Sequence, residues 1–322
     1  MLSDTLRHID YAALPISDYS RRYLLRMLPV LDYYLDIYRR TLERAFRLTA
    51  KPLQELTLVD YGGGHGILSL CAKEAGVGRV IYVDYNPQAA ETVQALSRRV
   101  GFGPDKVLTG DGAALLDGCR REGVVPDLLL GMDVIEHIYR LEDFFAQLYA
   151  VNPRLSMIFT TGSTPYNPWV RRRLHRVMAA DEQGRDGQAG FLAQRREYLR
   201  QHCPQLDAAA LDRWAVLTRG LTYADALQAV NDNLPPSPLG VDDPYNTCDP
   251  ATGSWTERIL PLAAYRRLLE TYHARLEVSN GYYNTFRAVG KRLPSELLNG
   301  LLATGGFRFL APFLFLTITP DK

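Results

Sequence analysis

The sequence contains few cysteines: four in 322 residues, at positions 71, 119, 203 and 248. No two of them stand in the C-x-x-C spacing that zinc sites and redox motifs use, and nothing in their spacing suggests a disulfide framework. We therefore expect no metal site and no disulfide bonds. Reduced thiols are typical of cytoplasmic proteins, so we expect the protein to be cytoplasmic.

The sequence also lacks an excess of charge of either sign. Lys and Arg number 37 and Asp and Glu number 36, which gives a formal net charge of +1. Domains that bind nucleic acid usually carry a basic excess, so we expect no nucleic-acid partner. The one strongly basic run, over 171–176, is too short to change this, and it indicates either a solvated helix face or an anion site.

Long apolar runs are missing as well. No run reaches the ~18 residues that span a bilayer, and the N-terminal MLSDTLRHID lacks the apolar core of a signal peptide. An apolar helix is expected over 293–302, preceded by Lys291 and Arg292. This helix either covers a sheet or touches a membrane surface, so membrane contact is expected to be peripheral at most.

A glycine-rich segment organises the chain, namely V-D-Y-G-G-G-H-G over 59–66. A β-prone run over 56–59 leads into it, and a helical pattern over 67–75 follows. A strand that enters a glycine turn and then a helix is the entry to a nucleotide site in α/β folds. Because glycine has no Cβ, the backbone can turn sharply there and a ligand can approach it closely.

Strands and helices alternate after this turn. Strands are expected over 79–83, 106–108, 127–131 and 155–161, and helices over 87–100, 113–121 and 141–149. This alternation predicts βαβ units and a parallel sheet, in which the loops after successive strands meet on one rim and bind ligands. Two more strands, over 275–279 and 313–319, are expected to complete the sheet.

Three acids follow the first three expected strands: Asp60, Asp84 and Asp111. A carboxylate after the second strand can accept both hydroxyls of a ribose. A carboxylate inside the turn repels a phosphate, which favours a nucleoside with a cationic or zwitterionic group over a dinucleotide. The dinucleotide pattern G-x-G-x-x-G is also broken, because Ile67 or Ser69 stands where its third glycine belongs. A nicotinamide-dependent dehydrogenase is therefore the less favoured alternative.

Four segments, in this order, resemble the successive motifs of class I S-adenosylmethionine-dependent methyltransferases. They are D-Y-G-G-G-H-G over 60–66, Asp84, Gly110-Asp111 and D-V-I-E-H-I over 133–138, the last being similar to the segment of the small-molecule branch. The resemblance covers residues 50–162 and, more weakly, the C-terminal end. It implies an α/β, Rossmann-like fold with a seven-stranded, mostly parallel sheet and an antiparallel C-terminal pair, and S-adenosylmethionine as the cofactor.

The resemblance assigns cofactor contacts to the glycine turn and to the acids around it. Gly62, Gly64 and Gly66 would let the backbone cradle the methionine and adenosine parts. Asp60 would lie near the methionine amino end, and Asp84 would bind the ribose hydroxyls.

The later motifs would complete the cofactor site. Asp111 would meet the adenine amino group, with the backbone N–H of Gly112 nearby, and Met132 and Asp133 would line the site beside the sulfonium. For Asp60 and Asp111, the capping of a turn is the alternative role.

The chain divides into four expected parts: an N-terminal helical cap over 1–50, a cofactor-binding Rossmann-like core over 51–162, a helical and loop insertion over 163–258, and a C-terminal completion of the core sheet over 259–322. The insertion is expected to contain helices over 170–180, 190–201, 208–219 and 223–231. Because it follows the fifth strand on the ligand rim, we expect a substrate lid. A solvent-facing ornament or a contact within a homodimer is the alternative.

Tyrosines are dense in the cap, at positions 19, 23, 33, 34 and 38. Two interpretations of them are open. Either the rings pack on the core and leave their hydroxyls in water, or they form an aromatic face that closes over a ligand.

The cofactor's sulfonium makes its methyl group electrophilic, so the protein must mainly align a nucleophile and exclude water. Where the nucleophile is an oxygen or nitrogen that carries a proton, a base removes that proton, and histidine is suited to this role. His137 is the first candidate base, with a purely structural role as its alternative. Tyr166 is the second candidate, and Tyr283 and His175 are weaker ones. His65, inside the glycine turn, is expected to lie too close to the cofactor to act on the acceptor.

The sequence thus predicts methyl transfer to a small molecule, a glycan or a lipid-linked acceptor, at oxygen. A non-catalytic protein that binds S-adenosylmethionine, or a scaffold with the same fold, is the alternative.

Overall fold

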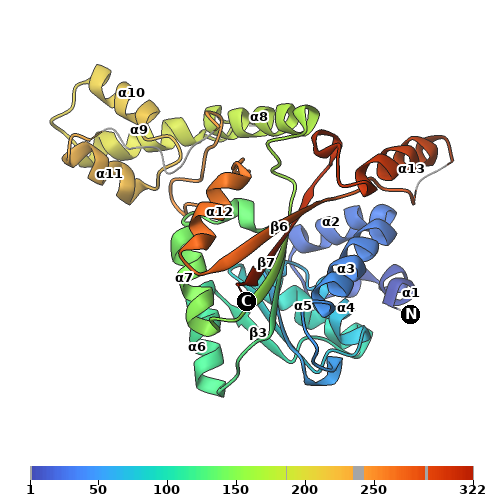
Figure 1. The fold of residues 1–322 in the computed structure, drawn as a ribbon. Coiled ribbons are helices and arrows are strands. Elements are labelled where there is room, and N and C mark those ends of the chain that lie inside the picture. Colours follow the sequence, from blue (N-terminus) through green and yellow to red (C-terminus); the bar gives the residue numbers. More distant parts are fainter. Residues whose placement is uncertain (1, 186, 235–242, 287–288, 322) are drawn as a thin grey trace.

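A seven-stranded sheet in the order β3-β2-β1-β4-β5-β7-β6 forms the centre of the computed structural model, which describes all residues except 1, 186, 235–242, 287–288 and 322 (Figure 1). Its strands are β1 Thr57–Tyr61, β2 Arg79–Asp84, β3 Lys106–Thr109, β4 Leu128–Met132, β5 Ser156–Thr161, β6 Ala274–Asn280 and β7 Leu314–Pro320. The first five strands are parallel, and β7 pairs antiparallel with both β5 and β6. The predicted fold class is confirmed.

Helices cover both faces of the sheet, which is why its central strands are apolar at consecutive positions. On one face pack α1 Leu2–His8, α2 Asp18–Met27, α3 Leu31–Phe46, α4 Ile67–Glu74 and α5 Pro87–Val100. On the other pack α6 Gly112–Glu122, α7 Leu141–Val151 and α12 Leu262–Glu270. This sandwich of helix, sheet and helix leaves the carboxyl ends of the parallel strands free at one rim.

The N-terminal cap sits beside that rim. The turn η2, Leu28–Val30, separates α2 from α3, and Pro29 lies within it. Leu31, Leu35 and Leu42 of α3 are fully buried at helical spacing, so this face of α3 packs on the core.

The insertion after β5 contains the four predicted helices: α8 Pro168–Gln183, α9 Phe191–His202, α10 Ala208–Leu217 and α11 Tyr223–Asn231. The last three share a small core of their own, which includes Leu199, Trp214 and Val230. Figure 1 shows these three helices at the upper left, away from the cap, while α8 runs above the sheet. The residues 235–242, which the predicted lid includes, lie outside the described residues.

A buried ion pair attaches α9 to α8. The Arg195 guanidinium, which is fully buried, pairs with the Glu182 carboxylate, and Glu182 also accepts a hydrogen bond of 2.6 Å from the hydroxyl of Thr247. The bundle is therefore joined to α8 and to the returning loop by a polar network in which both charges are paired.

The helix α13, Val289–Ala303, contributes Leu302 to the core, whereas its Leu297 is 73% exposed. The expectation that this helix covers the sheet therefore holds for its last turn. Among the described residues, no helix is both long and apolar enough to cross a membrane.

Gly66 offers a test of the packing beneath the glycine turn. Its φ is +76°, and an added Cβ would lie 2.1 Å from Cγ2 of Val93 on α5. We expect Gly66→Ala to lower the free energy of unfolding, measured in urea, by roughly 1–3 kcal/mol more than Gly76→Ala. Gly76 is the matched control, because its φ is +92° but an added Cβ would meet no atom within 4 Å. Equal losses for the two variants would contradict this account.

Candidate active site

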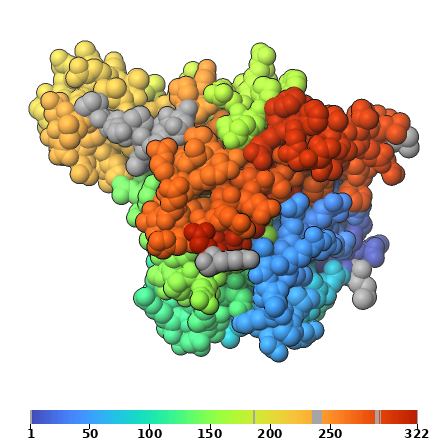
Figure 2. Space-filling model, viewed as in Figure 1, coloured from blue at the N-terminus to red at the C-terminus, as the bar shows by residue number. Residues whose placement is uncertain are grey.

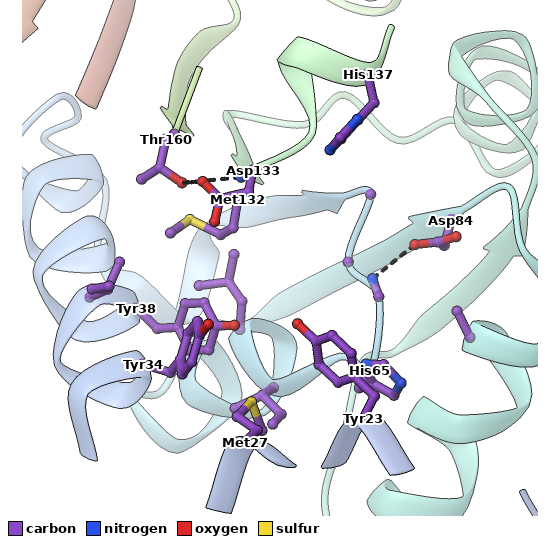
Figure 3. A pocket seen from close by; sticks show the side chains of 18 of the residues that line it. Tyr23, Met27, Tyr34, Tyr38, His65, Asp84, Met132, Asp133, His137 and Thr160 are labelled. Carbon is purple, nitrogen blue, oxygen red and sulfur yellow. Dashed lines mark hydrogen bonds between the residues drawn. The ribbon is translucent and has the colours of Figure 1, made fainter. Parts of the chain in front are cut away.

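A cavity of about 690 Å³ lies between the rim of the sheet and the N-terminal cap. This is within the size range of ligand pockets. Of the predicted site residues, it is lined by Asp60, Gly62, Gly64, Asp84, Met132, Asp133 and His137. Figure 3 shows part of this lining, with the rim on one side and tyrosines of the cap on the other.

The glycine turn is packed tightly on its inner side and open toward the cavity. The N–H groups of Gly62 and Gly63 both donate to the carbonyl of Val83, at 2.8 and 3.2 Å. A Cβ at Gly62 would lie 2.4 Å from Cγ2 of Val134, whereas one at Gly64 would meet no described atom within 4 Å. The space in front of Gly64 is therefore available to a ligand that approaches the backbone.

Asp84 lies at the end of β2, as predicted. One carboxyl oxygen accepts from the N–H of Gly64 at 2.8 Å, and the other accepts from the N–H of Asn86 at 2.9 Å. Burial raises the pKa of this carboxyl, while the two hydrogen bonds oppose that shift. Since each oxygen can accept further bonds, Asp84 retains the capacity to bind a pair of hydroxyls.

Two of the predicted cofactor acids cap helices. Asp60 is buried and accepts from the N–H and the hydroxyl of Ser69, at 3.0 and 2.6 Å, at the start of α4. Burial raises the pKa of Asp60 to about 7, against the opposing effect of these bonds. Asp111 caps α6 by accepting from the N–H groups of Ala113 and Ala114. The capping alternative therefore describes both acids, and their contacts with a cofactor stay a prediction.

Three predicted cofactor residues are missing from the described lining of the cavity: Gly66, Asp111 and Gly112. Gly66 is the N-cap residue of α4 and packs toward Val93, while Gly112 is the first residue of α6. Gly66 thus packs against α5, on the side of the turn that faces away from the cavity. Any contact of Asp111 and Gly112 with a ligand would be made at the edge of the cavity.

His65 and Tyr23 stack on each other at the mouth of the glycine turn, with ring centroids 4.3 Å apart. The Nε2 atom of His65 is buried and has no hydrogen-bond partner in the described part of the chain. Burial lowers the pKa of His65 to about 4, because it disfavours the charged imidazolium. A polar group of a ligand in the cavity could complete this hydrogen bond.

The cap supplies an aromatic wall. All five of the tyrosines singled out in the sequence, at positions 19, 23, 33, 34 and 38, line the cavity. The Tyr33 hydroxyl donates to the carbonyl of Tyr282 at 2.6 Å, which joins the cap to the segment after β6. Of the two interpretations of these tyrosines, the structure favours the second, in which their rings form an aromatic face that covers a ligand cavity.

The residues after β4 form the opposite wall of the cavity. Asp133 has a φ of +49°, a left-handed conformation that L-residues rarely adopt and that is common at functional sites. Its N–H donates to the hydroxyl of Thr160 at 3.1 Å, and that hydroxyl donates to the Asp133 carboxyl at 3.2 Å. Asp133 is open to the cavity, but the surrounding protein raises the pKa of its carboxyl, and the nearby Glu257 adds to this.

His137 also lines the cavity, at the end of η4, Ile135–His137. Its Nδ1 lies 2.8 Å from the carbonyl oxygen of Trp255. Because a carbonyl can only accept, Nδ1 carries the hydrogen, and Nε2 is left as a proton acceptor. The N–H of Trp255 in turn donates to the carbonyl of His137 at 3.1 Å.

The other candidate bases have partners elsewhere. Tyr166 is 38% exposed and packs under the guanidinium of Arg308, and it is missing from the described lining. His175 bonds to the carboxylate of Asp243 at 2.9 Å, and the hydroxyl of Tyr283 donates to the carbonyl of Leu310 at 2.7 Å. His137 is therefore the best placed of the four.

Sequence reasoning did not assign several lining residues to the site, among them Arg173, Glu257 and Thr160. Glu136 was part of a quoted motif but received no role in the site. Arg173 belongs to the basic run, so a signal for it was present. Glu257 lies near the end of the insertion, where no pattern marks it.

A family model described as "Methyltransferase domain" matches residues 32–225. Ribosomal protein L11 methyltransferase of Burkholderia mallei is 47% identical over 51 residues, which are 16% of this chain and 16% of that protein's length.

Several solved structures also resemble this chain. A SAM-dependent methyltransferase from Archaeoglobus fulgidus is 12% identical, with a TM-score of 0.40 over 88% of this chain and 93% of that one. PKMT2 from Rickettsia typhi, in complex with AdoHcy, is 13% identical, with a TM-score of 0.44 over 88% of this chain and 52% of that one.

The burial of His65 predicts an unusual titration. Its pKa of about 4 lies below the ordinary value of about 6.5, so the unfolded chain binds this proton first as the pH falls. We expect its ring signals in NMR spectra to titrate near pH 4, and its contribution to stability to be lost between about pH 6.5 and pH 4. Tyr23→Ala, which uncovers the ring, should move the midpoint upward. A wild-type midpoint near 6.5 would show that His65 is not enclosed as described.

Proposed function

Because the chain belongs to the methyltransferase-domain family and uses S-adenosylmethionine as its methyl donor, we propose that it methylates a hydroxyl group of a small molecule, a glycan or a lipid-linked acceptor. The observation that carries this proposal is the orientation of His137. Its Nδ1–H is held by the carbonyl of Trp255, so Nε2 is the atom that takes the proton of the acceptor hydroxyl.

The cavity has groups that fit the methyl donor. The open space in front of Gly64 lets a ligand contact the backbone. The remaining lone pairs of Asp84 suit a ribose diol, and the unpartnered Nε2 of His65 suits a polar group of the ligand. When bound, S-adenosylmethionine supplies an electrophilic methyl group. Met132 and Asp133, at the end of β4, are the proposed neighbours of its sulfonium.

The acceptor would enter from the side of η4 and α8. There His137 faces the cavity from η4 and Arg173 faces it from α8. The chain's own contribution is to hold the nucleophile in line, to remove its proton and to exclude water behind the tyrosine wall of the cap. The alternative, a non-catalytic protein with the same cofactor site, differs from this proposal in showing no turnover.

Asp84 provides the test of the cofactor site. We expect the wild-type protein to bind S-adenosylhomocysteine, and Asp84→Ala to weaken binding by roughly 1–3 kcal/mol through the loss of charge-assisted hydrogen bonds. Isothermal titration calorimetry measures both values. Asp117→Ala, on the outer part of α6, is a control for the loss of an acid, and it should bind like the wild type. A wild-type protein that gives no heat with S-adenosylhomocysteine but binds a nicotinamide dinucleotide would refute the assignment of the site.

His137 provides the test of catalysis. We expect His137→Ala to lower turnover by roughly 100- to 10,000-fold, the range typical of a lost general base, while leaving the affinity for S-adenosylhomocysteine intact. Methyl transfer from labelled S-adenosylmethionine to an acceptor found by screening hydroxylated compounds gives the rate. His175→Ala is the matched control, since His175 pairs with Asp243 outside the described lining. Unchanged turnover in His137→Ala would remove His137 as the base.

A further inference from the structure

Three carboxyl side chains meet at the acceptor end of the cavity. Asp133 follows β4, Glu136 lies in η4, and Glu257 lies in the returning loop before α12. The hydroxyl of Ser163 donates to Glu257 at 2.6 Å, which fixes this carboxylate beside the other two. Two other charged or titratable lining residues lie on this side of the cavity, His137 and Arg173. Carboxyl groups therefore outnumber cations here. The cap tyrosines at positions 23, 34 and 38 are close enough to Asp133 to interact with its charge.

Glu136 is the unusual member of this group, because its side chain is 1% exposed and only one of its two carboxyl oxygens has hydrogen-bond partners among the described residues. Its Oε1 accepts from the hydroxyl of Thr161 at 2.9 Å and from the N–H of Gly162 at 3.0 Å. Its Oε2 is buried and has no hydrogen-bond partner among the described residues. A buried carboxyl oxygen without a partner is costly, so a donor from outside the protein would stabilise this arrangement.

We propose that this group of three acids binds a protonated amine on the acceptor, with Oε2 of Glu136 as its principal contact and Asp133 and Glu257 beside it. An ammonium group has three N–H donors and no acceptor, which matches a wall of carboxyl oxygens. Hydrogen bonds between opposite charges are also the strong ones. The inference rests on the proposed function, and it narrows the acceptor to a compound that carries an amine as well as a hydroxyl.

The cofactor's own amino group is the competing occupant. Figure 3 shows Asp133 and His137 across the cavity from His65 and Tyr23, which mark the glycine-turn end. The resemblance places the methionine amino group at that other end, near Asp60. The described residues also offer no group of three or more His, Cys, Asp or Glu side chains arranged to hold a metal ion. The amine is therefore assigned to the acceptor.

The raised pKa values of these acids predict a second measurable effect of amine binding, the release of protons. Burial, and the mutual repulsion of the acids, raise the pKa of Glu136 well above its usual range, and burial raises that of Asp133. These acids therefore keep their protons to higher pH than ordinary carboxyl groups do. A bound ammonium favours the ionised carboxylates, so binding should release protons to the buffer.

Calorimetry on the protein saturated with S-adenosylhomocysteine tests this inference. The probes are two matched pairs: tyramine with 4-(2-hydroxyethyl)phenol, and n-butylammonium with n-butanol. We expect each ammonium compound to bind about 10- to 100-fold more tightly than its neutral partner, as hydrogen bonds between charged groups allow. Its binding heat should also differ between phosphate and Tris buffers, because protons are released.

Glu136→Gln should abolish this preference, since the amide keeps Oε1 and its two bonds but replaces Oε2 with a donor. Glu257→Gln should reduce the preference in part. Glu197→Gln, on the exposed surface of α9, should leave it unchanged. Near-ultraviolet circular dichroism verifies that each variant is folded.

Several outcomes would overturn the inference: equal binding of charged and neutral partners, no binding of either ammonium compound, or a Glu136→Gln variant that loses affinity for S-adenosylhomocysteine rather than for ammonium. The last outcome would assign the acids to the cofactor. If the wild-type protein does not bind S-adenosylhomocysteine at all, the proposed function fails first, and this inference fails with it.

Discussion

Two backbone hydrogen bonds hold together the end of the cavity that contains His137 and Glu257. The N–H of Trp255 donates to the carbonyl of His137, and the N–H of Arg258 donates to the carbonyl of Glu136, at 3.1 and 3.0 Å. They bind the end of the insertion to the turn after β4. The orientation of the His137 ring and the position of Glu257 both depend on this pairing, because both lie on the two segments that it joins.

The position of the glycine turn and of Asp84 at the rim could be predicted from the sequence because the signals are local. The glycine turn, the strand before it and Asp84 at the end of the next strand each follow from a few neighbouring residues, and the parallel sheet brings them to one rim. The contacts around His137 could not be predicted, because they join residues that are distant in the chain. Trp255 is 118 residues from His137, and no spacing announces such a pair.

Tyr166 and Asp111 have contacts in the structure that neighbouring residues in the sequence did not reveal. Tyr166 follows the fifth strand on the predicted rim, yet its ring packs under Arg308, which lies between the expected helix over 293–302 and the expected strand over 313–319. Asp111 stands where the motif requires an acid, and the structure shows it capping α6. A carboxylate at a helix start satisfies the free N–H groups of the first turn. The same residue type therefore serves either role, and position in the sequence does not separate them.

The helices α9, α10 and α11 surround a core of their own and are joined to α8 through Arg195 and Glu182. The insertion's described contacts with the cavity come from α8, where the insertion leaves the sheet, and from the loop around Glu257, where it returns. These contacts lie at the two ends of the insertion, and no described residue of α9, α10 or α11 lines the cavity. The bundle is thus built as a separate module, with its own core, whose described residues take no part in enclosing the cavity.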